Sequence, residues 1–477
     1  MDKAWKRYAP AVCAGLGVLC LAGTVWAALY QDLSRLEIYN NGWNGTLAPV
    51  QGTLGQRTAV AAALIALAAL ALLLLRLEGI DNRTLLMMLL PVAAAMLVRS
   101  LMLEFMSGDY NRFLSHWVDH FRLNGGFAGI AEDLGDYNVP YLYILAAISY
   151  SSVPDLYLIK LVSILADVLL AWGGFRLVRI LRGDREGDRA PLTAFILLLF
   201  LPTVVLNGAL WGQCDAIYGA LVLHALAAVL NGKNKTSVAL LAVAFSFKLQ
   251  TIFLVPLWGV LWLARRVKFR ELLVFPLTYA LTIVPALLLG KPLEDILSIY
   301  FDQMGEFPAL VLNAPSVFQL LPSKIADHKD LVTRAGILAA FALALALLGV
   351  GLWLGRRMDN AAVMTAAVVL AIGVPFFLPH MHDRYFFLAD VTTLCWACAN
   401  WKRTPAAVLA AGASLASYMV YLRLKFNFVF TLFGTQYVMG LEALAMLTAL
   451  LFSMGVLIWE LSRFLNDGKP SERRENL

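Results

Sequence analysis

Long apolar stretches separated by short polar segments dominate the chain. Residues 59–75 and 85–98 contain no charged side chain. Helices formed by such stretches would leave no polar face for water, so they do not fit a soluble protein. An α-helix crosses a bilayer with about 20 apolar residues. The pattern therefore predicts an all-α polytopic membrane protein with about 14 transmembrane helices, near residues 9–30, 58–76, 84–104, 156–181, 190–207, 215–231, 236–247, 251–265, 271–290, 333–355, 360–379, 385–400, 404–423 and 436–462.

Composition supports this fold class. Of the 477 residues, 60% are apolar and 15% are charged, whereas a soluble domain carries about 25% charged residues. These values exclude a soluble enzyme, a disordered chain and a disulfide-rich secreted fold. The Cys395-x-x-Cys398 pair lies in an apolar run without the flanks of a redox motif, so we expect no metal or redox role for it.

Clusters of Lys and Arg indicate the orientation, because such clusters stay on the cytoplasmic side of a membrane. With about 14 crossings, all the main clusters fall on one side, so both termini are expected in the cytoplasm. The net charge of +6 follows from this topology and does not indicate nucleic acid binding. The lack of a cleavable signal favours a bacterial plasma membrane. The clusters lie at residues 3–7, 76–83, 176–189, 233–235, 265–270, 356–357, 402–403 and 463–474.

Counting crossings between the basic clusters also decides whether two ambiguous segments cross the membrane. Residues 141–150 are apolar, but a crossing there would place the cluster 176–189 outside, so we expect an interfacial helix on the external face. Residues 236–265 lie between two basic clusters and must cross twice. The break falls near Phe247–Gln250. Lys248 would then lie at the external side, on a turn between two short helices that line a cavity.

Polar residues gather at the external ends of the predicted helices, where they are costly unless they serve a function. Asp109 follows Gly108 just after a predicted span, and its carboxylate can face a cleft at the membrane surface. A carboxylate there suits a general base that takes a proton from an acceptor hydroxyl. The alternative is an N-cap for the following helix, because Asp favours that position.

Several cations at the external ends of predicted helices break the positive-inside pattern, among them Lys248, Arg384, Arg423 and Lys425. An anion held at the external surface would explain them. The alternative is that these side chains extend to lipid head groups. Asp167, within a predicted span, is either a hydrogen-bonded structural carboxylate or part of a site.

His380 and His382 form a His-x-His pair that could chelate a metal. Arg384 lies next to them, and a cation beside a metal is unfavourable. A phosphate shared by His and Arg therefore fits this segment better than a metal ion.

Six motifs in order resemble those of the GT-C class of membrane glycosyltransferases, over roughly residues 84–400. The resemblance is to the dolichyl-phosphoglucose-dependent glucosyltransferases of asparagine-linked glycan assembly and to the bacterial family related to the GPI-anchor mannosyltransferases. In the fourth motif a Leu separates the Lys from the Gln, which departs from the family pattern. The motifs are Gly108-Asp109-Tyr110, Asp136-Tyr137-Asn138-Val139-Pro140-Tyr141, Trp211-Gly212-Gln213-Cys214-Asp215, Phe247-Lys248-Leu249-Gln250, Asn313-Ala314-Pro315 and His380-Met381-His382-Asp383-Arg384.

The resemblance implies a GT-C fold whose external loop bears amphipathic helices. It also implies inverting transfer of a hexose, mannose or glucose, from a polyprenyl-phosphate donor to a glycan, lipid-linked or protein acceptor at the external face. No metal or nucleotide cofactor is expected. Asp109 would be the base, and Lys248, His380, His382 and Arg384 would bind the donor phosphate. Sugar or acceptor contacts would come from Tyr110, Asp136, Tyr137, Trp211, Gln213, Asp215, Gln250 and Asn313, with helix capping as the alternative for Asp215.

We expect three regions: an N-terminal two-helix extension (1–83), a catalytic core (84–400) with its first external loop at 105–155, and C-terminal helices with a cytoplasmic tail (401–477). The alternative function is a transporter or lipid-glycan flippase, whose fold would show internal repeats and polar sites near the midplane. The sequence shows no clear repeat, and its polar residues lie at helix ends. A third class, a non-catalytic subunit of a cell-envelope complex, would not need Asp109 in a cleft.

Overall fold

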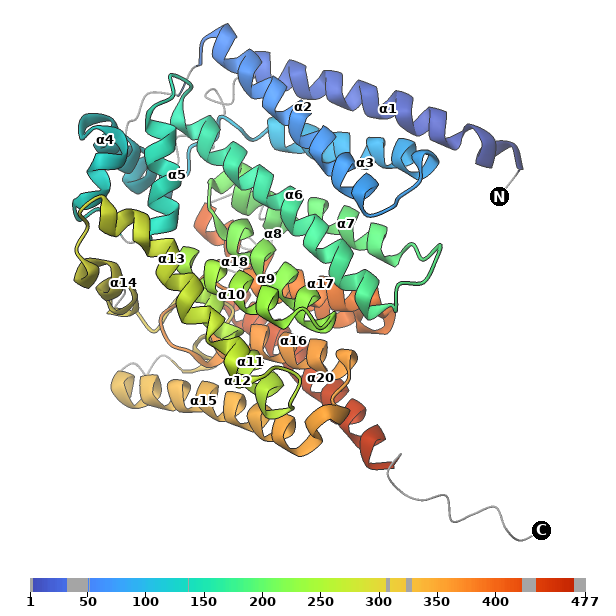
Figure 1. The fold of residues 1–477 in the computed structure, drawn as a ribbon, viewed down its shortest axis with the longest axis vertical. Coiled ribbons are helices and arrows are strands. Elements are labelled where there is room, and N and C mark those ends of the chain that lie inside the picture. The colour runs from blue at the N-terminus through green and yellow to red at the C-terminus, as the bar shows by residue number, and fades with distance from the viewer. Residues whose placement is uncertain are drawn as a thin grey trace.

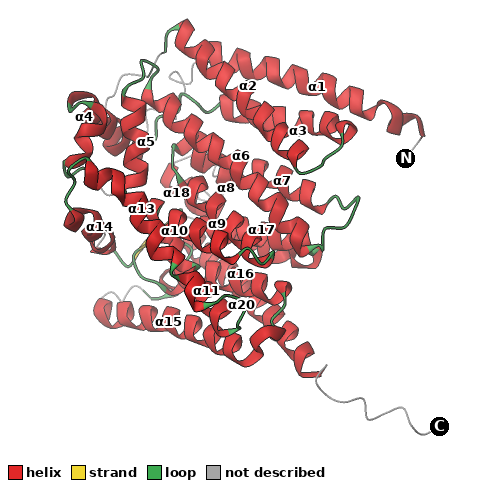
Figure 2. Ribbon diagram, viewed as in Figure 1, coloured by secondary structure: helices red, strands yellow, loops and turns green. Residues whose placement is uncertain are grey.

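The computed structural model describes residues 3–31, 50, 52–135, 137–305, 309–322, 328–422 and 435–466. Helices make up nearly all of this part of the chain (Figure 2). The prediction of an all-α polytopic membrane protein is confirmed.

Three N-terminal helices form one side of the molecule (Figure 1). They are α1 (Lys3–Tyr30), α2 (Leu54–Leu77) and α3 (Asn82–Ser100). Thr53 and Gln56 form a capping box at the start of α2, and the Asp81 carboxylate accepts from two backbone N–H groups at the start of α3. Such caps satisfy backbone donors that a helix leaves unpaired.

A buried layer of helices forms the centre of the bundle. In α16 every residue from 362 to 376 is buried, because other helices cover it on all sides. Two helical pieces, Ala190–Phe200 and Pro202–Trp211, meet at 46°. Pro202 begins the second piece, since proline cannot continue a helical hydrogen-bond ladder. The layer comprises α6 (Asp155–Leu181), α7 (Ala190–Phe200), α8 (Pro202–Val205), α9 (Asp215–Leu230), α16 (Asn360–Phe377) and α17 (Phe387–Ala399).

Seven further helices surround this layer. Among them, α18 packs against α17 and α20, and α15 packs against α11 and α16. These helices are α10 (Asn234–Phe247), α11 (Val255–Leu263), α12 (Phe269–Leu272), α13 (Val274–Leu288), α15 (Lys329–Leu354), α18 (Thr404–Leu422) and α20 (Thr435–Asn466).

Every predicted span is a helix, but not every one has the full length of a crossing. Within the described residues, nine helices are long and apolar enough to span a membrane, or ten if the bent pair Ala190–Phe200 and Pro202–Trp211 counts as one span. The other four predicted spans form shorter apolar helices: Asp215–Leu230, Asn234–Phe247, Leu249–Leu263 and Phe387–Ala399. These helices are short because polar site residues such as Asp215 and Lys248 lie at their ends.

The two ends of the bundle differ in character. The N-terminus, the loop between α6 and α7 and the end of α20 lie at one end, whereas α4 (Ser115–Leu123), α5 (Val139–Ser149) and α14 (Leu293–Gly305) lie at the other (Figure 1). Of the helices in the 105–155 loop, α4 is amphipathic and α5 is not. The apolar α5 buries most of its residues against neighbouring helices, and its expected position on the external face of the membrane stays a prediction.

Asp167 on α6 forms a buried ion pair with Arg99 on α3. The Arg99 Nε atom lies 2.9 Å from a carboxylate oxygen of Asp167, and both side chains are fully buried. Arg99 also donates to the backbone carbonyl of Leu199 on α7. Arg99 therefore links α3 to α6 and α7, and Asp167 serves as its buried counter-ion, which agrees with the structural alternative for Asp167.

Candidate active site

A cavity of about 280 Å³ lies at the end of the bundle that carries α4, α5 and α14. This volume is close to the lower end of the range for small-molecule pockets, about 300 Å³. Seven of the sequence-predicted site residues line it: Asp109, Tyr137, Gln213, Lys248, Gln250, His382 and Arg384. The structure thus brings together side chains from five separate segments of the chain.

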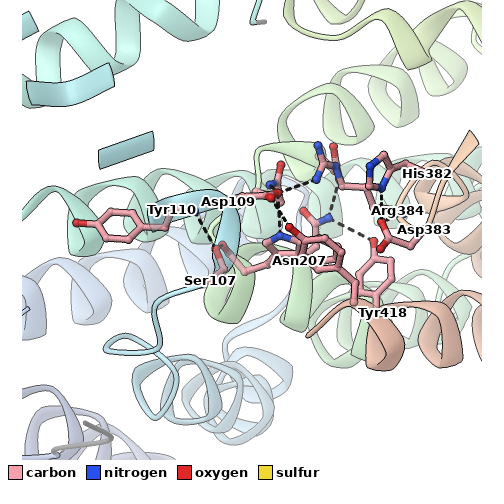
Figure 3. A network of polar contacts seen from close by, with 12 residues as sticks. Ser107, Asp109, Tyr110, Asn207, His382, Asp383, Arg384 and Tyr418 are labelled. Atoms are coloured by element: carbon pink, nitrogen blue, oxygen red, sulfur yellow. Dashed lines mark hydrogen bonds and ion pairs between the residues drawn. The ribbon is translucent and has the colours of Figure 1, made fainter. Parts of the chain in front are cut away.

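Asp109 lies at the centre of a hydrogen-bond network (Figure 3). One carboxylate oxygen, Oδ2, accepts from Trp211 Nε1 at 3.0 Å and from Arg384 at 2.9 Å, and also from Gln213. The other oxygen, Oδ1, accepts from the Tyr421 hydroxyl. The carboxylate caps no helix, so the N-cap alternative for Asp109 is wrong.

A tight turn at Gly212 explains the spacing of Trp211 and Gln213 in the Trp211–Asp215 segment. Trp211 ends a π-helical turn, and Gly212 reverses the chain in the left-handed conformation with φ of 78°, which glycine adopts without a steric penalty. This turn points both Trp211 and Gln213 at Asp109. Tyr137 donates to Gln213 Oε1 at 2.9 Å. Burial raises the pKa of Tyr137 well above its usual value, so its hydroxyl remains protonated and can donate.

Lys248 and Asp215 form a salt bridge beneath the cavity. Lys248 adopts an extended backbone between α10 and a 3₁₀ turn, Leu249–Phe253, which confirms the predicted break at this position. Asn207 donates to the second oxygen of Asp215 at 2.7 Å. The Asp215 side chain is 1% exposed and that of Lys248 is 9% exposed, so Lys248 faces the cavity and Asp215 supports it from below.

Arg384 connects the two carboxylates of the site. Its guanidinium pairs with Asp109 at 2.9 Å, approaches Asp215 at 3.8 Å and lies over the Trp211 ring, 5.5 Å from the ring centroid. Burial alone would lower the pKa of Arg384, but Tyr137, Asp109 and Asp215 together raise it. The guanidinium therefore stays charged.

A short parallel sheet holds the His380–Arg384 segment. Strand β1 (Val311–Leu312) pairs with β2 (Met381–His382), and Asn313 forms a further bridge with His382. Asp383 is fully buried and lies 2.9 Å from His382 Nδ1. A carboxylate on one imidazole nitrogen fixes the ring orientation, so His382 presents a defined edge to the cavity.

Several predicted residues lie away from the cavity lining. The Tyr110 ring points away from Asp109 and its hydroxyl donates to Asp155 at 2.9 Å (Figure 3). His380 Nδ1 contacts the Ala309 carbonyl at 2.7 Å. Asn313 contacts the site through its backbone bridge with His382. Trp211 is fully buried behind Asp109. Asp136, Arg423 and Lys425 lie outside the described residues.

The comparison with protein families agrees with this architecture. The model of glycosyltransferase family 87 matches residues 137–379, just over half of the chain. The chain belongs to glycosyltransferase family 87. This is a membrane family of the GT-C type, so the resemblance drawn from the sequence is confirmed. No curated protein matches the chain.

The family 87 match covers only part of the site. It contains Tyr137, the Trp211–Asp215 segment, Lys248, Gln250 and Asn313, but Asp109 precedes it and Arg384 follows it. Eight lining residues are not among the predicted site residues, and they include Arg112, Gln303, Tyr385 and Tyr421. Arg112 lies one helical turn after Asp109, a spacing that places two side chains on one face, and this signal was available in the sequence.

The two histidines of the His-x-His pair contact different partners: His380 contacts the Ala309 carbonyl, and His382 contacts Asp383. Within the described ranges, no three His, Cys, Asp or Glu side chains converge in a way that could hold a metal ion. The residues around this cavity therefore offer a carboxylate and several cations in place of a cluster of metal ligands.

Breaking the buried Lys248–Asp215 pair is expected to destabilise the fold. Lys248→Met leaves the Asp215 carboxylate buried without its cation, and such a loss costs about 3–5 kcal/mol. The double variant Lys248→Met/Asp215→Asn removes both charges and is expected to regain most of that stability. Thermal unfolding of the purified variants in detergent measures both effects.

The Arg122–Asp119 pair provides the matched control. Its side chains are 35% and 58% exposed, and breaking an exposed pair costs less than about 1 kcal/mol. A Lys248→Met variant as stable as an Asp119→Asn variant, which breaks only the exposed pair, would contradict the supporting role of Asp215.

Proposed function

We propose that the protein transfers a hexose, mannose or glucose, from a polyprenyl-phosphate donor to an acceptor hydroxyl, with inversion at the anomeric carbon. The observation that carries this proposal is the convergence of the Asp109 carboxylate with Lys248, His382 and Arg384 on one cavity. A carboxylate can take the acceptor proton, and the cations can hold a phosphate.

The proposed step is a single displacement. The oxygen of the acceptor hydroxyl bonds to the anomeric carbon as the bond from that carbon to the phosphate oxygen breaks. The hydroxyl proton passes to Asp109, and the electron pair of the broken bond leaves with polyprenyl phosphate. Attack on the face opposite the leaving group inverts the configuration.

Lys248, His382 and Arg384 would stabilise the leaving group. Negative charge grows on the phosphate as the bond lengthens, and fixed cations aimed at that charge lower the barrier. This arrangement requires no metal ion and no nucleotide. The cavity volume suits a sugar phosphate, with the lipid chain of the donor lying outside the cavity, in the membrane.

Arg384 couples donor binding to the base. In the structure it is paired with Asp109, and a donor phosphate would compete for the same guanidinium. Partial transfer of Arg384 to the phosphate leaves Asp109 with less opposing charge, which favours its action as a proton acceptor. This favours an order in which the lipid donor binds before the acceptor.

We place the reaction at the external face of a bacterial plasma membrane, with both termini in the cytoplasm. This orientation rests on the basic clusters, because the loop between α6 and α7 lies at the end of the bundle opposite α4 and α14 (Figure 1). Membership of a glycosyltransferase family argues against the transporter or flippase alternative.

An assay with the purified chain in lipid nanodiscs tests this proposal. Polyprenyl-phosphate mannose and polyprenyl-phosphate glucose are offered with lipid-linked, polysaccharide and peptide acceptors, with and without EDTA. We expect transfer from one of the two donors, inverted stereochemistry by NMR and full activity in EDTA. Transfer from a nucleotide sugar alone, or retention of configuration, would overturn the proposal.

A further inference from the structure

One face of the otherwise apolar helix α18 carries four hydroxyl side chains. Ser414, Ser417, Tyr418 and Tyr421 follow the spacing i, i+3, i+4, i+7, which places them on one side of a helix. Three of them are fully buried, and Tyr421 lines the cavity. This face of α18 therefore points into the bundle and reaches the site.

Each hydroxyl of this face has a polar partner on another segment. Ser414 donates to Asp390 on α17 at 2.8 Å, and Ser417 donates to Glu442 on α20 at 2.9 Å. Tyr418 accepts from Asn207 at 3.3 Å. These contacts fix the rotation and depth of α18, and with them the position of Tyr421.

The ring of Tyr421 is fixed as well. It stacks on Trp211 with 4.4 Å between ring centroids and 18° between the ring planes. Trp211 itself donates a hydrogen bond to Asp109. Tyr421 therefore presents its hydroxyl to Asp109 from a rigid aromatic pair.

The two oxygens of Asp109 differ in how many donors they already have. Oδ2 accepts from Trp211, Gln213 and Arg384. Among the side chains that the structure describes, Oδ1 accepts one hydrogen bond, from Tyr421. A carboxylate oxygen has about two acceptor sites, so Oδ2 is saturated and Oδ1 can accept one more donor.

We infer that the acceptor hydroxyl binds at Asp109 Oδ1, directly beside the Tyr421 hydroxyl, and that Tyr421 is a positioning residue for this subsite. The inference rests on the proposed function. The acceptor proton passes to Oδ1 while the acceptor oxygen bonds to the anomeric carbon and polyprenyl phosphate leaves. Tyr421 holds Oδ1 towards the cavity, so α18 belongs to the acceptor site even though it lies outside the residues matched by the family model.

Tyr421→Phe tests this role, because it keeps the stacked ring and removes the hydroxyl. A hydrogen bond to a charged group is worth roughly a 10- to 100-fold effect, so kcat/KM for the acceptor is expected to fall by that factor. Binding of the polyprenyl-phosphate sugar, measured by calorimetry in nanodiscs, should stay within twofold of the wild type.

Thr365→Val is the matched control. It removes a buried hydrogen bond between α16 and α17 and touches neither the cavity lining nor α18, so it should lower thermal stability and leave the acceptor KM unchanged. Equal losses of donor and acceptor affinity in Tyr421→Phe, or no loss at all, would overturn the inference while leaving the proposed function intact. Absence of transfer by the wild type from either lipid donor would overturn the proposed function itself.

Discussion

Asp109→Asn is expected to lower kcat about 1,000-fold, the middle of the range for removal of a general base. The amide oxygen of Asn can occupy the Oδ2 position and accept from Trp211, Gln213 and Arg384. Its NH₂ group would then face Tyr421, whose hydroxyl can rotate to accept. The fold and the donor site therefore persist, but the variant has no base to accept the proton of the acceptor hydroxyl.

A single-turnover assay with preloaded donor measures this effect on the chemical step. Asp119→Asn is the matched control, since Asp119 lies on the adjacent α4, pairs with Arg122 and is exposed. We expect that control to transfer sugar at the wild-type rate. An Asp109→Asn variant with wild-type turnover would rule out Asp109 as the base.

Arg384→Ala is expected to lower kcat/KM about 100-fold, because removal of one donor to a developing negative charge typically costs 100-fold or more. The effect has two parts, which separate in the measurement. The affinity for the product polyprenyl phosphate should fall, since Arg384 would bind the phosphate. Turnover at saturating donor should fall too, since the leaving group loses stabilisation.

Arg384→Lys should restore part of this loss, as Lys keeps the charge but not the paired geometry of the guanidinium. Arg357→Ala, an exposed arginine between α15 and α16, controls for loss of a cation in general. If Arg384→Ala kept the wild-type affinity for polyprenyl phosphate, Arg384 would have no role in holding the donor.

The sequence was sufficient to predict the helices, because apolar runs in a membrane protein have few other ways to satisfy their backbone groups. It predicted the break at Lys248 from the spacing of basic clusters alone. The predicted bounds of α9, α10 and α17 lie within two residues of the observed ones, although hydropathy does not reveal that these helices stop at a polar cavity inside the bundle. Counting crossings kept α5 out of the set of spans, and α5 is indeed a short helix of 11 residues.

The lining of the site was predicted where a motif carried it and missed where a contact depended on packing. Gln213, Lys248 and Arg384 lie in recognisable motifs. Tyr421 contacts Asp109 because the contacts of Ser414 and Ser417 set the rotation of α18. A local sequence pattern does not identify the side chains against which such a helix packs. For the same reason, the position of Asp215 beneath Lys248 could be recognised only in the structure.

The contacts of Asp109 reach across most of the chain, to partners 275 and 312 residues further on. During synthesis, the first half of the protein enters the membrane with this carboxylate but without Arg384 and Tyr421. A nascent chain is therefore unable to transfer sugar until α18 is inserted. Sugar transfer can accordingly serve as a direct measure of complete membrane insertion, for this chain and for variants that are made at full length but integrate incorrectly.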